Sequence, residues 1–169
     1  NPSSDTTTRW VASMLTSLNL TVTPMETKAD ELITMSATLK DESGIPLASY
    51  FINYYVDSQK IGSSLTNAFG VSSFTYRPPE ANPFLEIEAV FNGSAKYRDA
   101  HAFVFVKVDL RDTILALTLP GTATVDKAIT ISSTLTDKNT TSAIPNANID
   151  YYLITGWLWQ KINSSLTGA

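Results

Sequence analysis

Residues 32–41 read LITMSATLKD, and residues 128–137 read AITISSTLTD. In the first stretch every second residue from Ile33 to Leu39 is apolar, and the residues between them are polar. The same alternation returns from Ile129 in the second stretch. A period of two is that of a β-strand with one buried face. Each stretch is therefore predicted to be a half-buried strand, and the second to be a copy of the first.

The copy extends beyond these two stretches. The second begins 96 positions after the first (128 minus 32), and the same spacing relates LNLTVTP at 18–24 to ILALTLP at 114–120. Later matches have spacings of 99, 97 and 101, and they pair IPLA at 45 with IPNA at 144, NYYV at 53 with DYYL at 150, and SSLT at 63 with SSLT at 164. Each change falls where a loop or strand end is expected. An internal repeat of this length indicates tandem modules.

Strand signals recur along the first module, with turn residues between them. The predicted strands are 18–23, 32–39, 50–56, 60–66, 71–76, 84–91 and 101–108. Seven short strands in about 100 residues are typical of an immunoglobulin-like sandwich, and no segment carries a helical period with caps. The sequence thus predicts an all-β protein of tandem immunoglobulin-like antiparallel β-sandwiches. Its predicted parts are an N-terminal arm (1–17), module 1 (18–108), a linker (109–113) and an incomplete module 2 (114–169).

Four N-x-S/T sequons make Asn19, Asn92, Asn139 and Asn163 candidates for N-glycosylation. Asn19 lies on the polar side of a predicted strand. Asn92 follows a strand in a turn, and Asn139 lies in the longer loop of module 2. We expect none of these three positions to force a sugar into a core.

Three motifs resemble those of a known family: TMSATLKDESGIP (34–46), NAFGVSSFTY (67–76) and AVFNGSAKY (89–97). They are similar to the prokaryotic immunoglobulin-like repeats of bacterial and archaeal surface proteins. Such repeats are strung in tandem in invasin- and intimin-like adhesins and in archaeal surface or filament proteins. The resemblance covers module 1 and, as far as it goes, module 2. It implies extracellular spacers or building blocks and carries over no catalytic residue.

The second module stops early. In the repeat Ala169 corresponds to Ala68, so module 2 lacks the counterpart of residues 69–108, which are 40 residues and hold the last three predicted strands. Such a module exposes an apolar face and unpaired strand edges. Either the sequence is a window of a longer tandem array, or a strand of another subunit completes the module head to tail. A short second domain that is stable by itself is the third alternative.

The N-terminal arm supplies candidates for such a strand. Shifting the repeat back by 96 places residues 5–17 opposite residues 101–113, where the final strand of a preceding module would lie. The apolar residues that would form its stripe are Trp10, Ala12 and Met14 or, alternatively, Val11 and Leu15.

Trp157 and Trp159 replace the plain hairpin DSQK (57–60) of module 1. Two tryptophans on one face beside a turn can pack on their own sandwich, contact a neighbouring subunit or domain, or stack on a sugar. The sequence leaves these three uses open.

Composition limits the chemistry. The net charge is −4, 17% of the residues are charged, and Lys and Arg form no cluster, which argues against a nucleic-acid groove or an anionic membrane surface. Cysteine is absent, and so are an apolar run long enough for a transmembrane segment and a glycine-rich phosphate loop. His101 is the only histidine, and the loop acids Asp41 and Asp137 fit turns better than a calcium site. We therefore expect no enzymatic activity, cofactor or metal.

These patterns together predict an extracellular structural protein, a module of a cell-surface array, filament or adhesin stalk, with strand donation as one route of polymerisation. Its partners would be copies of itself or adjacent modules of a longer chain. The alternative is a glycan- or receptor-binding adhesin module, in which surface glycans are the partners.

Overall fold

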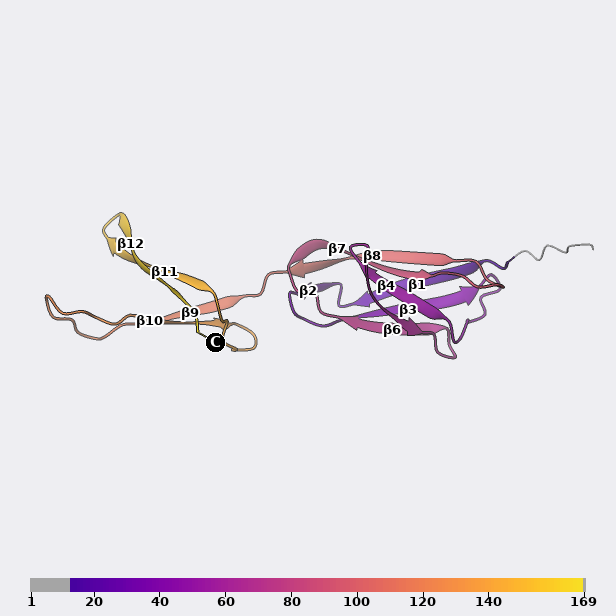
Figure 1. The fold of residues 1–169 in the computed structure, drawn as a ribbon, viewed down its shortest axis with the longest axis horizontal. Coiled ribbons are helices and arrows are strands. Elements are labelled where there is room, and N and C mark those ends of the chain that lie inside the picture. Colours follow the sequence, from indigo (N-terminus) through magenta and orange to yellow (C-terminus); the bar gives the residue numbers. More distant parts are fainter. Residues whose placement is uncertain (1–12, 169) are drawn as a thin grey trace, which may run out of the picture. The chain divides into compact units, whose positions relative to one another are not determined.

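The computed structural model describes residues 13–168, which form strands and no helix. The chain divides into two compact units, residues 1–110 (unit 1) and residues 111–169 (unit 2), and Figure 1 shows the strands of each. Within the described range no helix has the length and apolar character needed to cross a membrane. The all-β class predicted from the alternation is confirmed.

The described part of unit 1 holds two sheets. Its strands are β1 (Thr16–Thr23), β2 (Glu26–Lys28), β3 (Ile33–Asp41), β4 (Phe51–Val56), β5 (Gln59–Leu65), β6 (Val71–Tyr76), β7 (Asn82–Phe91) and β8 (Ala100–Asp109). One sheet has the order β1-β3-β6 and the other the order β2-β8-β7-β4-β5, and every pair is antiparallel except β2 with β8. All seven predicted strands of module 1 are present. The alternation does not predict β2, because three residues are too few to show a period.

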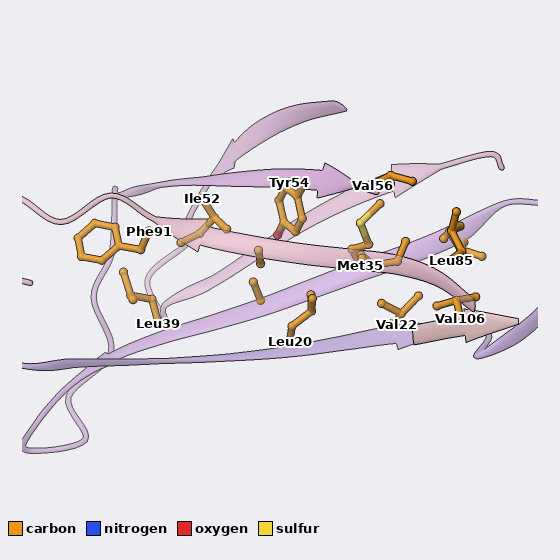
Figure 2. Close-up of a cluster of buried hydrophobic side chains, with 14 of the residues drawn as sticks. Leu20, Val22, Met35, Leu39, Ile52, Tyr54, Val56, Leu85, Phe91 and Val106 are labelled. Atoms are coloured by element: carbon orange, nitrogen blue, oxygen red, sulfur yellow. The ribbon is translucent and has the colours of Figure 1, made fainter. Parts of the chain in front are cut away.

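Side chains from both sheets of unit 1 meet in one core. Leu20 of β1 and Met35 of β3 pack in the same cluster as Tyr54 of β4, Ile87 of β7 and Val106 of β8. Figure 2 shows such side chains pointing toward one another from the two sheets. Each occupies an apolar position of the alternation. Burying one such side chain contributes about 1.5–3 kcal/mol, so this cluster is the main source of stability in unit 1.

Unit 1 begins before β1. Met14 forms a parallel bridge with Tyr97: its N–H donates to the carbonyl of Lys96 (2.8 Å), and its own carbonyl accepts from the N–H of Arg98 (2.9 Å). The Met14 side chain packs against the core of unit 1. Residues 14–17, which the sequence assigns to the arm, are therefore part of unit 1.

Unit 2 consists of two hairpins in its described part. Its strands are β9 (Thr113–Thr118), β10 (Ser132–Asp137), β11 (Asn148–Thr155) and β12 (Leu158–Leu166). β9 pairs with β10 and β11 pairs with β12, both antiparallel. The strand expected from residue 128 begins only at Ser132, so β10 is shorter than β3.

β9 and β10 pair one residue away from the register that the repeat implies. Leu18 pairs with Leu39 in unit 1, and a spacing of 96 would pair Ile114 with Leu135. In unit 2 Leu135 instead pairs with Leu115. Directly opposed residues of an antiparallel pair share a face, so the shift turns the leucines of β9 to the face that carries Leu135. The hydrophobic pattern, rather than the letter-by-letter match, sets this register.

Candidate functional site: the open face of unit 2

An apolar groove of about 820 Å³ lies on unit 2, with walls from both hairpins. Its apolar lining residues are Leu115, Leu117, Leu119, Ile129, Ile131, Ile149, Tyr151, Tyr152, Leu153 and Ile162. Leu115, Leu117 and Leu153 each expose more than half of their surface. A patch of large apolar side chains in contact with water marks an interaction surface or a ligand-binding groove.

Two strands that line this groove lack a neighbour that the matching strands of unit 1 have. In unit 1, β3 pairs with both β1 and β6, and β4 pairs with both β5 and β7. In the described part of unit 2, β10 pairs with no strand but β9, and β11 with no strand but β12. Backbone N–H and C=O groups along such edges are a template for an added strand. Unit 2 therefore presents an apolar groove and the hydrogen-bonding edges that a β-strand needs.

The loop before β11 has the same hydrogen bonds as the loop before β4. The Thr66 hydroxyl donates to the carbonyl of Leu47 (2.7 Å) and accepts from a backbone N–H three residues after Leu47 (3.0 Å). The Thr167 hydroxyl donates to the carbonyl of Ile144 (2.6 Å) and accepts from a backbone N–H three residues after Ile144 (2.9 Å). The hydrogen bonds thus relate the two loops by 97 positions (144 minus 47). The match of IPLA with IPNA, which has a spacing of 99, misaligns the two loops by two residues.

The two hairpins β4–β5 and β11–β12 share a β-bulge. Tyr54 pairs with Gly62 and the next residue with Lys60, which leaves Ile61 as the extra residue. In unit 2 Ile162 is the extra residue in the same way. Beyond the bulge β4–β5 has two residue pairs before its turn, whereas β11–β12 has four. The extension adds two residues to each strand, which accounts for the change of spacing from 97 to 101.

This extension carries the two tryptophans, and residues 154–159 are named the tryptophan hairpin. Gly156 takes a positive φ of 61° in its turn, a conformation that glycine adopts without strain. Trp157 follows in the turn and is fully exposed, so it packs on nothing in the described part of its own unit. Trp159 is 66% exposed, with its ring centroid 6.2 Å from that of Tyr152. Own-unit packing, one of three uses left open by the sequence, is absent for Trp157.

Tyr151 links the two hairpins of unit 2. Its hydroxyl lies 2.7 Å from the Ser133 hydroxyl on β10 and 3.2 Å from the Ser165 hydroxyl on β12. These two hydrogen bonds lower the pKa of Tyr151, and the bond with Ser133 has the larger effect. The comparable Tyr54 is fully buried, and burial raises its pKa.

Gly62 and Asn163 each stand opposite the inward tyrosine of their hairpin, Tyr54 and Tyr151. In unit 1 the ring of Phe74 on β6 stacks on Tyr54 with a centroid distance of 5.4 Å, and a Cβ at Gly62 would overlap that ring. Asn163 places a Cβ at the matching position. The sequence shows the exchange of Gly for Asn, but its meaning depends on where β6 lies.

The linker end of unit 2 is fixed by a buried carboxylate. Asp137 accepts hydrogen bonds from the backbone N–H of Thr140 (2.8 Å) and of Asn139 (3.0 Å), and from Nε of Arg111 (2.8 Å). The hydrogen bond from the N–H of Thr140 and, with a smaller effect, the bond from Arg111 hold the pKa of Asp137 well below its usual range. Asp41 likewise accepts two backbone N–H groups of its own turn. Both acids are occupied by turn chemistry, and residues 13–168 contain no group of three acidic or histidine side chains able to hold a metal.

The other predicted site residues are spread over both units. Trp10, Val11 and Ala12 lie outside the described residues. Leu15 is 54% exposed beside the start of β1. His101 is an exposed residue of β8, with Nδ1 3.9 Å from a carboxylate oxygen of Glu88.

All four sequon asparagines are exposed, but they face different surroundings. Asn19 lies on β1, and Asn92 and Asn139 lie in loops. Asn163 lines the apolar groove. A sugar on Asn163 would therefore stand at the groove.

Neither a search of protein-family models nor a search of curated proteins finds a match for the chain. Function is therefore inferred from the geometry of unit 2 and from the sequence.

Proposed function

We propose that this protein is an extracellular, non-enzymatic structural component of a cell-surface array, filament or adhesin stalk, built from two tandem immunoglobulin-like sandwiches. The strand order of unit 1 supports the fold, because one sheet takes β1, β3 and β6 and the other β2, β8, β7, β4 and β5. The shared threonine network and the shared bulge support a duplicated module. The exposed, hydroxyl-rich and sequon-bearing surface supports an extracellular location.

The observation that carries the assembly role is the open face of unit 2. Leucines and isoleucines of both hairpins meet water in the groove, and β10 and β11, which line it, each pair with one strand in the described part of the unit. The loop at 142–144 occupies the outer edge of β10 at Leu135 and Asp137, so the added strand would meet β10 before these residues. A β-strand laid along either edge satisfies backbone groups and buries the groove in one step. Covering unit 2 is therefore coupled to association with another segment, which makes this face an assembly site.

The segment that fits this role is the N-terminal arm of another copy. Met14 is already hydrogen-bonded within unit 1, so the part that can be donated is residues 1–12. Trp10 and Ala12 or, alternatively, Val11 supply apolar side chains for the groove, because successive residues of a strand point to opposite faces. The contact is heterologous, and repeated head to tail it generates a filament. The donated strand pairs with either β10 or β11, and an adjacent module supplies the partner of the other.

Deletion of residues 1–12 tests the proposal. The truncated chain retains Met14 and therefore the fold of unit 1, and we expect it to remain monomeric at concentrations where the full chain forms oligomers in light scattering. A chain with residues 1–12 scrambled is the matched control, because it keeps composition and length but loses the apolar pattern. Equal assembly of the deleted and full chains would show that the arm is not the donor.

A further inference from the structure

The turn after β7 contains Asn92-Gly93, the only Asn-Gly pair in the sequence. The Asn92 side chain is exposed, and in the part of the chain that the structure describes no hydrogen bond holds its side-chain amide or the N–H of Gly93. Asn67, an exposed turn asparagine after β5, differs, because its Oδ1 accepts from the N–H of Phe69 (2.9 Å) and of Val71 (3.0 Å). The amide of Asn92 is therefore free to turn toward the neighbouring backbone, and the amide of Asn67 is not.

The turn requires glycine at position 93. Gly93 has a positive φ of 79°, which glycine adopts without strain. A Cβ at this position would lie 3.0 Å from the carbonyl oxygen of Tyr97 and 3.0 Å from the backbone nitrogen of Asp99, so the turn closes tightly against these residues. The fold thus keeps beside Asn92 the residue that hinders an attack of the backbone on its side chain least.

The same turn carries the backbone groups that hold Met14. The N–H of Ser94 donates to the carbonyl of Tyr97 (2.8 Å), and the Ser94 hydroxyl accepts from the N–H of Tyr97 (3.1 Å). On either side of the buried Tyr97, the carbonyl of Lys96 and the N–H of Arg98 form the hydrogen bonds to Met14. A change in the length of the backbone within this turn therefore reaches the Met14 bridge.

We infer that Asn92 is a site of deamidation and that its isoaspartate product loosens the Met14 bridge. The backbone nitrogen of Gly93 attacks Cγ of Asn92: the N–Cγ bond forms, the Cγ–Nδ2 bond breaks, and ammonia leaves with the proton of the Gly93 N–H. Water then opens the cyclic succinimide, giving its hydroxyl to one carbonyl carbon and its proton to the nitrogen. Opening at the side-chain carbonyl yields aspartate, and opening at the main-chain carbonyl yields isoaspartate, whose backbone is longer by a methylene. This inference goes beyond the proposed function and does not depend on it.

Peptide mapping by mass spectrometry tests the reaction on the full chain, made in a host that adds no N-glycans and kept at mildly alkaline pH. Aspartate and isoaspartate should accumulate at position 92 while Asn67 stays intact. Asn92→Gln is the control and should stay unconverted over the same time, because its longer side chain closes a larger ring. A synthetic peptide of residues 88–98 gives the rate without the fold. Conversion of this peptide while Asn92 of the folded chain stays intact would overturn the inference.

Amide hydrogen exchange tests the effect on the Met14 bridge. The fraction that contains isoaspartate should lose protection at the amides of Met14 and Arg98, relative to unconverted protein. Freshly prepared Asn92→Asp is the matched control, because it carries the new negative charge on a backbone of ordinary length, and it should keep this protection. Equal protection in the isoaspartate fraction and the unconverted protein would overturn the coupling, and so would an equal loss in Asn92→Asp, which would assign the effect to charge.

Discussion

Tyr54 and Tyr151 show how two similar units differ. Tyr54 is enclosed by β6, with its hydroxyl bonded to Ser72 and its ring stacked on Phe74. Tyr151 occupies the matching bulge, but its hydroxyl bonds Ser133 of the neighbouring hairpin and its ring borders an open groove. The same local sequence thus lies in a finished core in unit 1 and beside an exposed apolar groove in unit 2. The difference lies in what covers each tyrosine.

Truncating the two tyrosines should give the largest contrast. Tyr54→Ala removes a fully buried ring and should lower the free energy of unfolding of unit 1 by about 3–5 kcal/mol. Tyr151→Ala removes a ring that water already reaches, so it should change the stability of the dissociated chain far less and weaken assembly instead. Urea unfolding of the dissociated chain, followed by light scattering of the assembled one, measures both effects. Equal losses of stability would contradict the comparison.

Exchanging the residues opposite these tyrosines should have a smaller effect. Gly62→Asn forces a side chain against Phe74 and should cost about 1–3 kcal/mol, as overpacking does. Asn163→Gly meets no such neighbour in unit 2, and its effect should be limited to the greater backbone freedom of glycine, about 0.5–1 kcal/mol. Thermal unfolding of both variants tests the pair. A neutral Gly62→Asn would mean that the packing of β6 on β5 is looser than described.

Acid should loosen the leading end of unit 2 through Asp137. Its pKa is lowered in the folded chain, so the unfolded chain binds the proton more readily. The stability that the carboxylate contributes is therefore present above its ordinary pKa of about 3.9 and is lost as pH falls toward the lower folded value. The protection of the Thr140 amide, measured as its exchange rate relative to the intrinsic rate at each pH, should decrease over this range. Asp137→Asn should abolish this pH dependence, and a variant with unchanged dependence would assign it to another group.

The smallest expected effect is a difference in glycan occupancy between Asn163 and the other three sequon asparagines. In a glycosylating host, we expect sugar on Asn19, Asn92 and Asn139, which lie away from the groove, and none on Asn163 in assembled material. Peptide mass spectrometry of assembled and monomeric fractions makes the measurement. Asn163→Gln serves as the control and should assemble normally. Full occupancy of Asn163 in the assembled fraction would place the completing segment elsewhere.

Sequence patterns predict unit 1 well because its alternation and its burial agree. The apolar positions from Ile33 to Leu39 are the buried ones, and the predicted strands are found. They predict unit 2 less well because matching residues of the two repeats do not pair in the same strand register. Pairing of Leu115 with Leu135 follows the leucine pattern and departs from the spacing of 96.

The candidate site was only partly accessible from sequence. The internal repeat predicts apolar strand faces in unit 2 like those of unit 1, and the tryptophans stand out as residues without a counterpart. The unpaired edges and the contrast between Gly62 and Asn163 depend on which strands lie side by side, and no local pattern reports this. Met14 illustrates the limit: its apolar character suggests a donated stripe, but long-range bonds to the segment around Tyr97 place it in unit 1.

We propose that a strand from another copy covers the open face of unit 2. Amide hydrogen exchange of β10 and β11 in assembled and in dissociated protein tests it most directly. We expect these amides to be protected in the assembled chain, to exchange rapidly in the dissociated one, and to lose protection when residues 1–12 are deleted. Equal protection in both states, or protection that survives the deletion, would contradict the claim.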